Sequence, residues 1–195
     1  LKSFSFFFTT LCFLLFINAL NMFDGINCQS GSYCNLIFLI FVFKGIIPEF
    51  CLIIILAISF FLLLNYKNKI YLGESGVLIL AFIIGYIFIK ASSNSHNYFL
   101  ADEIFIIMAL PGLDMFRLFI LRLYNGKHPF SSDTNHIHHL ISKHYTNTKT
   151  FIIIFIFILV TIILYFYISK KSRATQTRLT NYFRIDMRGN RGKFM

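Results

Sequence analysis

The sequence predicts an all-α protein, a polytopic transmembrane helix bundle of about six spans. The first observation is composition: 57% of the residues are hydrophobic and 13% are charged, whereas soluble domains carry about 25% charged residues. The second is a series of apolar runs, several of which approach the ~20 residues that cross a bilayer. These runs cover residues 4–20, 33–45, 48–64, 77–90, 98–120 and 151–169. Polar turns separate them, so each run is expected to form its own helix.

Two of the runs, 33–45 and 77–90, are shorter than a full crossing. At about 1.5 Å per residue they would cover only part of a ~30 Å hydrocarbon core. We expect them to borrow flanking residues, to tilt little or to be partly re-entrant. Pro48 opens the next run, and proline is well tolerated in a first helical turn.

The two ends of the chain differ from the rest. The first run, 4–20, has no small-residue cleavage site after it, so it is predicted to be a membrane span and not a signal peptide. Because the chain begins Leu1-Lys2, we expect it to be the C-terminal part of a longer protein. Residues 1–169 would then be the C-terminal part of a membrane domain, and residues 170–195 a basic tail with little regular order.

The distribution of basic residues predicts the orientation of the bundle. With alternating crossings, the polar segments 21–32, 65–76 and 121–149 share one side of the membrane and carry most of the loop lysines and arginines. By the positive-inside rule this side is cytoplasmic. The net charge of +10 is therefore expected to reflect loops near anionic lipid rather than nucleic-acid binding. The basic tail conflicts with this scheme. Either a final crossing is missing, the last run does not cross fully, or the tail is unusual.

The cysteines indicate no metal site or disulfide. Cys12, Cys28, Cys34 and Cys51 form no CxxC pair. Free cysteines of this kind most often behave as small buried hydrophobic residues.

Two short polar segments on the predicted cytoplasmic side contain candidate site residues. NMFDGIN (21–27) directly follows the first span, and a continuing helical turn would place Asn21 and Asp24 on one face. YLGESG (71–76) precedes an apolar run, so Glu74 could hold a hard cation such as Mg²⁺ near a helix N-terminus. Each also has a simpler interpretation, an ordinary polar turn in the first case and a helix capped by Ser75 in the second.

The third polar segment is RLYNGKHPFSSDTNHIHH (122–139), which holds four of the six histidines. Histidine, arginine and lysine together suit phosphate recognition by charge and hydrogen bonds. HxHH could instead bind a transition metal, but no nearby cysteine completes a structural zinc set. A surface histidine cluster without function is the other alternative.

Four charged residues lie within the run before this segment. Asp114 and Arg117 are three residues apart and could form a pair on one helix face. Asp102 and Glu103 fall near the outer face of the membrane, so we expect a minor structural or boundary role for them.

In this order the three segments resemble the polyprenyl-phosphate N-acetylhexosamine-1-phosphate transferase family, the MraY/WecA-like membrane enzymes. NMFDGIN resembles the family's N-x-x-D-G-[IL]-[DN], and YLGESGVLILAFIIG resembles F-x-G-D-[ST]-G-S-L-x-L-G. DMFRLFILRLYNGKHPFSSDTNHIHHL resembles D-x-x-R-x-x-x-x-R-x-x-x-G-x-x-P-F-x-x-D-x-x-H-x-H-H-L. The resemblance covers roughly residues 1–145 and fits the WecA-like branch better than the muramoyl-pentapeptide branch.

The resemblance implies an enzyme that moves a sugar-1-phosphate, such as GlcNAc-1-phosphate, from a UDP-N-acetylhexosamine onto polyprenyl (undecaprenyl) phosphate. UMP is released, and a cell-envelope glycan such as lipopolysaccharide is begun. The family's cofactor is Mg²⁺, with Mn²⁺ as an alternative ion. The implied location is the bacterial inner (plasma) membrane, with the active site at the cytoplasmic face. Neither the sugar nor the glycan pathway is specified, and a homodimer is left open.

The resemblance also implies roles for individual residues. These are Asp24, Glu74 and His138 as catalytic residues, Asn21, Asp24, Asn27, Arg122, His136, His138 and His139 as substrate-binding residues, and Glu74 as the metal ligand.

Three features depart from the family pattern. Glu74 replaces an aspartate, Cys28 replaces a glycine, and the sequence has no adjacent Asp-Asp pair, which the family uses for Mg²⁺ and the lipid phosphate. We therefore expect the 195 residues alone to be inactive. The alternative is a degenerate relative, or a non-catalytic polytopic membrane protein such as a transporter subunit.

Overall fold

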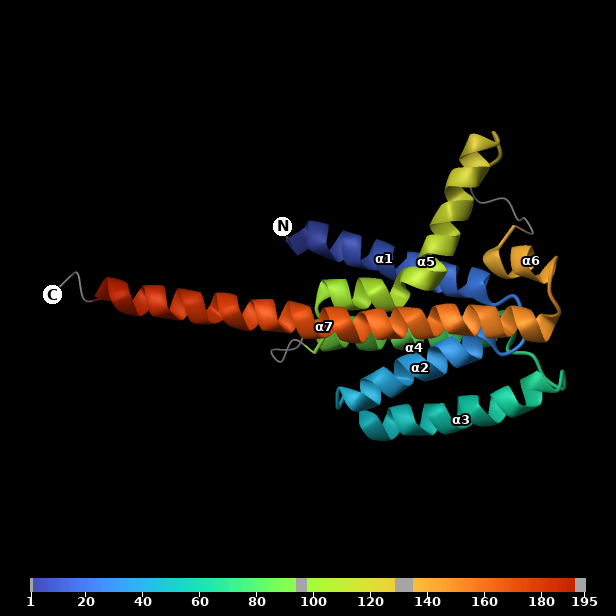
Figure 1. Ribbon diagram of the computed structural model, residues 1–195, viewed down its shortest axis with the longest axis horizontal. Coiled ribbons are helices and arrows are strands. Elements are labelled where there is room, and N and C mark those ends of the chain that lie inside the picture. The colour runs from blue at the N-terminus through green and yellow to red at the C-terminus, as the bar shows by residue number, and fades with distance from the viewer. Residues whose placement is uncertain (1, 94–97, 129–134, 192–195) are drawn as a thin grey trace.

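The computed structural model describes residues 2–93, 98–128 and 135–191, and these residues form seven α-helices and no strand (Figure 1). The helices are α1 (Lys2–Phe23), α2 (Gln29–Phe43), α3 (Pro48–Tyr66), α4 (Gly73–Ser93), α5 (Ala101–Tyr124), α6 (Ile137–Ser142) and α7 (Asn147–Arg191). The predicted all-α bundle is confirmed.

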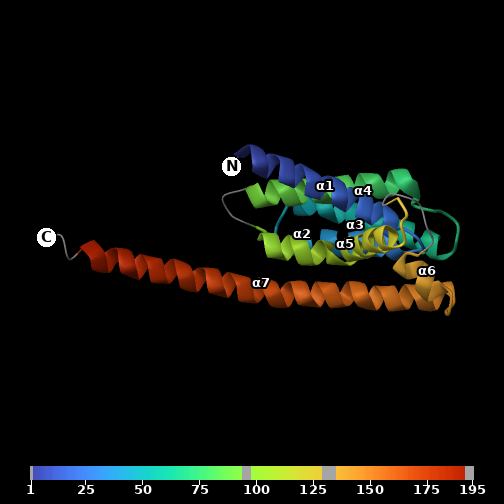
Figure 2. The same ribbon diagram turned by 90° about the horizontal axis from the view of Figure 1, so that it is seen from above.

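The long helices lie along one common axis, and the short α6 lies at one end of it (Figures 1 and 2). Of the described helices, α1, α3, α4, α5 and α7 are long and apolar enough to cross a membrane. Helix α2 has 15 residues, which at 1.5 Å per residue is about 22 Å and short of a ~30 Å core. Helix α4 gains the flanking residues that its short apolar run needed and reaches 21 residues. The chain is a multi-pass membrane protein.

Aromatic rings fill the core where α2, α4, α5 and α7 meet. The rings of Phe41 and Phe88 are 5.0 Å apart and edge to face, and Phe99 packs on both at 5.9 and 5.0 Å. Two glycines lie where side chains of another helix pack onto the backbone, as small residues allow in membrane bundles. A Cβ added at Gly31 in α2 would lie 2.8 Å from the side chain of Leu62 in α3. A Cβ added at Gly85 would lie 2.5 Å from the ring of Phe13 in α1.

Helix α5 bends in the middle, and Figure 1 shows its second half turning away from the bundle axis. Pro111 lies inside the helix and lacks the N–H that would bond the carbonyl of Ile107, four residues earlier. That carbonyl instead accepts a 2.7 Å hydrogen bond from the hydroxyl of Tyr33 in α2. Tyr33 is fully buried, so water cannot replace it as a donor. A side chain from another helix therefore satisfies the carbonyl that the proline frees.

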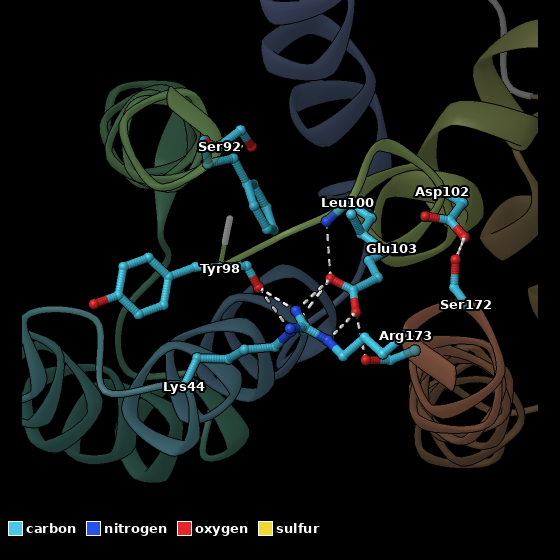
Figure 3. A network of polar contacts seen from close by, with 10 residues as sticks. Lys44, Ser92, Tyr98, Leu100, Asp102, Glu103, Ser172 and Arg173 are labelled. Carbon is cyan, nitrogen blue, oxygen red and sulfur yellow. Dashed lines mark hydrogen bonds and ion pairs between the residues drawn. The ribbon is translucent and has the colours of Figure 1, made fainter. Parts of the chain in front are cut away.

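A buried ion cluster joins α2, α5 and α7 at the end of the bundle opposite α6 (Figure 3). The Glu103 carboxylate, which is fully buried, lies 3.2 Å from Lys44 Nζ and 3.1 Å from Arg173 Nε. Ser169 also donates a hydrogen bond to it. Both cations donate to the carbonyl of Tyr98, at 2.8 and 2.7 Å. The structural role expected for Glu103 is confirmed.

Helix α7 continues far beyond the bundle (Figures 1 and 2), which contradicts the expectation of little regular order in 170–195. The described residues stay helical through Arg191. Neither glycine nor proline interrupts the sequence from Asn147 to Arg188, so nothing in it stops the helix. Ser172 also donates a 2.8 Å hydrogen bond to Asp102, which ties the start of the tail to α5.

Replacing Tyr33 by phenylalanine should destabilise the bundle. The Tyr33→Phe change keeps the ring but leaves the Ile107 carbonyl buried without a donor, which costs about 1–3 kcal/mol of unfolding free energy. Thermal unfolding in detergent measures the change. Tyr86→Phe is the matched control, because the Tyr86 side chain is exposed. Equal melting temperatures for the two variants would contradict the assigned role of the hydroxyl.

Replacing Glu103 by glutamine should loosen α7. Glu103→Gln leaves Lys44 and Arg173 without their counter-charge, and breaking a buried pair in this way costs about 3 kcal/mol. Asp102→Asn, one residue earlier on an exposed side chain, should change stability by less than about 0.5 kcal/mol. Thermal unfolding again provides the measurement, and a Glu103→Gln protein as stable as Asp102→Asn would show that the cluster does not hold α7.

Candidate functional site

Two of the three predicted motifs are in contact at the end of the bundle that holds α6. The ring of His138 packs directly against the backbone of Gly25, where an added Cβ would lie 1.8 Å from Nε2 of the histidine. Only glycine leaves room for this contact. Asp24 therefore lies one residue from the point at which the histidine segment meets the first motif.

Asn65, near the end of α3, fastens the first motif to the loop that leads to the second. The backbone N–H of Cys28 donates to Asn65 Oδ1 at 2.6 Å, and Asn65 Nδ2 donates to the carbonyl of Ile70 at 2.7 Å. Asn27 adds a hydrogen bond to the side chain of Asn68. These bonds hold the two loops side by side.

Cys28 occupies a backbone conformation that favours glycine. Its φ is +66°, in the left-handed region that costs other residues about 1–2 kcal/mol. The resembled family has glycine at this position, and the conformation gives a physical reason for that preference. The bond to Asn65 holds Cys28 in place despite the strain.

Glu74, the predicted metal ligand, is an exposed residue in the first turn of α4. The helix begins at Gly73, so Ser75 lies inside it and the alternative of Ser75 as N-cap is wrong. Among the described residues, no group of three His, Cys, Asp or Glu side chains could hold a metal ion. The structure therefore does not unite Glu74 with other ligands, and its metal-binding role stays a prediction.

The third motif forms a compact cluster of imidazole rings around α6. The rings of His136 and His138 are nearly parallel with centroids 5.5 Å apart, and those of His138 and His139 are 4.3 Å apart. His138 is 1% exposed. The long segment that precedes α7 is thus partly helical and partly buried, rather than a solvated surface loop.

Burial shifts the pKa of both Asp24 and His138 toward the uncharged form. Burial lowers the pKa of His138 to about 4, and the neighbouring histidines add to this effect. Burial also raises the pKa of Asp24, although the hydroxyl of Ser30 opposes the shift. At neutral pH His138 can thus offer hydrogen bonds but no positive charge. Its Nδ1 has no partner among the described residues.

Asp114 is a site residue that the sequence analysis placed only in a pair with Arg117. That pair is confirmed at 2.8 Å. The second carboxylate oxygen lies 3.1 Å from Nδ1 of His136, and the N–H of Ile137 donates to the carboxylate at 3.2 Å. Arg117 also donates to the carbonyl of Asn135 at 2.6 Å. A carboxylate within an apolar run indicates a functional residue. The sequence does not predict its hydrogen bonds to His136 and Ile137, which are more than twenty residues away.

The other predicted site residues also lie near helix ends. Asn21 is in the last turn of α1, where its carbonyl accepts the N–H of Asp24 at 3.3 Å. Arg122 is buried in the last turn of α5. Gln29, which the sequence analysis did not single out, begins α2 fully buried, and its amide has no hydrogen-bond partner in the described part of the chain. Asp133 of the third motif lies outside the described residues.

Replacing Gly25 by alanine should separate the two motifs. In Gly25→Ala the new methyl group would displace the His138 ring, so the pKa of His138 should rise from about 4 toward the ordinary value of about 6.5. Histidine NMR titration measures this. Gly112→Ala is the control, because a Cβ there meets nothing within 4 Å. Identical His138 titrations in the two variants would refute the contact.

Comparisons with known proteins show which sequences this chain is similar to. Residues 1–92 match the model of glycosyl transferase family 4. The undecaprenyl-phosphate alpha-N-acetylglucosaminyl 1-phosphate transferases of Salmonella typhi and Escherichia coli K12 are 29% and 30% identical to the chain over 165 residues. These alignments cover 78% of this chain and 45% of each relative.

The protein of the same name from Yersinia pestis is 31% identical, over 70% of this chain and 41% of its own. The chain thus spans less than half the length of the curated relatives it matches. No solved structure matches it. The resemblance predicted from the three motifs is confirmed: the first 92 residues are similar to glycosyl transferase family 4, and most of the chain is similar to the alpha-N-acetylglucosaminyl 1-phosphate transferases named above.

Proposed function

We propose that this chain forms part of a membrane enzyme that transfers N-acetylhexosamine-1-phosphate from a UDP-sugar to polyprenyl phosphate and releases UMP. The observation that carries the proposal is the packing of His138 against Gly25, which joins the first and third motifs at one end of the bundle. The names of the relatives support undecaprenyl phosphate and GlcNAc-1-phosphate as the acceptor and the transferred group.

The proposed roles follow from the charges of the substrates. Both are anionic, so the site must offset negative charge and hold the reacting phosphates in line. We assign Asn21, Asp24 and Asn27 to the nucleotide-sugar, and Arg122 to phosphate because it keeps its charge. The histidines 136, 138 and 139 would contribute hydrogen bonds, since His138 is neutral at pH 7.

Mg²⁺, with Mn²⁺ as the alternative, is proposed as the cofactor, and Glu74 as one ligand. Carboxylate oxygens are what these ions prefer. The described residues do not by themselves fit a metal centre, because no second carboxylate joins Glu74 in a ligand group. We therefore derive no step of the reaction through the ion.

We propose the bacterial inner membrane as the location, with the α6 end facing the cytoplasm. The basic loops that predicted this orientation belong to the α6 end. The start of the basic tail lies at the other end, but Arg173 is paired there with Glu103, which it shares with Lys44. This pairing removes part of the conflict with the positive-inside rule.

The test is UMP release by the full-length protein with undecaprenyl phosphate and a panel of UDP-sugars. We expect activity that falls by at least about a hundredfold in Glu74→Ala, the size of effect that loss of a group stabilising the transferring charge produces. Glu49→Ala is the matched control, because Glu49 is an exposed first-turn glutamate of α3 at the opposite end of the bundle.

The outcomes separate the alternatives. No activity with any UDP-sugar would favour a degenerate or non-catalytic membrane protein. Activity that survives in Glu74→Ala would remove Glu74 from the site, and activity that survives in His138→Ala would remove His138. Normal turnover by the 195 residues alone would contradict the expectation that they lack part of the site.

A further inference from the structure

We propose that Asp114 is a positioning residue of the candidate site. Its carboxylate fixes the ring of His136 with the proton on Nδ1, so that Nε2 is left to accept a hydrogen bond from the substrate. The identity of that substrate rests on the proposed function, whereas the state of the ring does not.

The Asp114 carboxylate is buried and shared among several donors. One oxygen, Oδ1, accepts from Arg117 Nη2 at 2.8 Å and from the N–H of Ile137 at 3.2 Å. The other, Oδ2, lies 3.1 Å from Nδ1 of His136. Asp114 is 6% exposed, so water does not compete for these positions. A guanidinium and a backbone N–H can only donate, which leaves the ionised carboxylate as the acceptor for all three partners.

This geometry determines the tautomer of His136. An ionised carboxylate can only accept, so Nδ1 of His136 must carry the proton that lies between the two side chains. In a neutral imidazole the other nitrogen then has a lone pair and no proton. Nε2 of His136 is therefore an acceptor at neutral charge.

Because Nε2 of neutral His136 accepts a hydrogen bond, the substrate group beside it must be a donor. A phosphate oxygen is also an acceptor, so it gains nothing from a neutral Nε2. The O–H and N–H groups of the nucleotide-sugar, such as its sugar hydroxyls and amide N–H groups, are donors and fit. We therefore place His136 beside the sugar or the base of the donor substrate, and not beside the diphosphate.

The same carboxylate also sets the position of the other histidines. The N–H of Ile137 is the first of α6, and Asp114 holds it at 3.2 Å. His138 follows one residue later and packs on Gly25. Asp114 thus links α5 to the start of the helix that presents the ring cluster to the first motif.

Substitution by asparagine gives a specific test. In Asp114→Asn one carboxylate oxygen becomes an NH₂ group. Arg117 and the N–H of Ile137, which face Oδ1, can only donate hydrogen bonds. Nδ1 of His136 can either donate or accept, so it is the partner that can change. The amide oxygen should turn to Arg117 and Ile137, and its NH₂ group should donate to His136 Nδ1. The proton of His136 should therefore move from Nδ1 to Nε2.

Nitrogen-15 NMR of the histidine rings measures this tautomer directly at pH 8.5, which lies above the ordinary histidine pKa of about 6.5. We expect a protonated Nδ1 in the unaltered chain and a protonated Nε2 in Asp114→Asn, with Asp102→Asn as a control that leaves the ring unchanged. Loss of the signal in His136→Gln assigns it. An unprotonated Nδ1 of His136 in the unaltered chain would overturn the proposal. The same tautomer of His136 in Asp114→Asn as in the unaltered chain would also overturn it.

Kinetics of the full-length protein test the consequence for substrate. In Asp114→Asn the KM for the UDP-sugar should rise about tenfold, as expected when an acceptor becomes an opposing donor, while the KM for polyprenyl phosphate stays the same. An unchanged KM for the UDP-sugar, or an equal rise for both substrates, would overturn the assignment. If the unaltered full-length protein has no transferase activity, the proposed function fails, and the NMR result still decides the state of His136.

Discussion

The hydrogen bond from Tyr33 to the carbonyl of Ile107 is the constraint on which the geometry of the candidate site depends. A proline in an apolar helix frees a carbonyl where lipid offers no donor. The hydroxyl from α2 satisfies that carbonyl and so permits α5 to bend at Pro111. Because the second half of α5 carries Asp114 and Arg117, the direction of these charged side chains follows from a contact made in the apolar core.

From that bend, a short series of contacts leads to the motifs. Asp114 holds the start of α6, α6 places His138 on Gly25, and Asn65 ties the adjoining loop to Ile70 in the loop before α4. Apart from the bond between Asn65 and Ile70, these contacts join segments more than twenty residues apart in the sequence. The opposite end of the bundle is held by ion pairs instead, because the Glu103 carboxylate contacts two cations there. The ion cluster at that end fixes helices, while the α6 end combines the Asp114–Arg117 ion pair with a His138 ring that is neutral at pH 7.

The apolar runs and the order of the motifs were enough to predict the helices and the family, because both depend on local composition and spacing. The contacts that build the site were not predictable in the same way. The sequence does not predict that the hydroxyl of Tyr33 donates to the Ile107 carbonyl freed by Pro111, since this hydrogen bond depends on how α2 packs against α5. The pair of Asp114 with Arg117 follows from a spacing of three residues, but the bond of Asp114 to His136 joins residues 22 apart and depends on how α6 packs on α5. The helical tail was missed because basic composition was taken as a sign of little order.

The protonation states limit what the histidine cluster can do. The three rings have centroids 4.3–6.4 Å apart, and burial together with the neighbouring histidines lowers the pKa of His138 to about 4. His138 accordingly stays neutral at pH 7. A neutral His138 can take part in hydrogen bonds but adds no positive charge that attracts phosphate. If the site binds two phosphate-bearing substrates, the attraction must come from groups that keep their charge, and Arg122, buried in the last turn of α5, is one that does so.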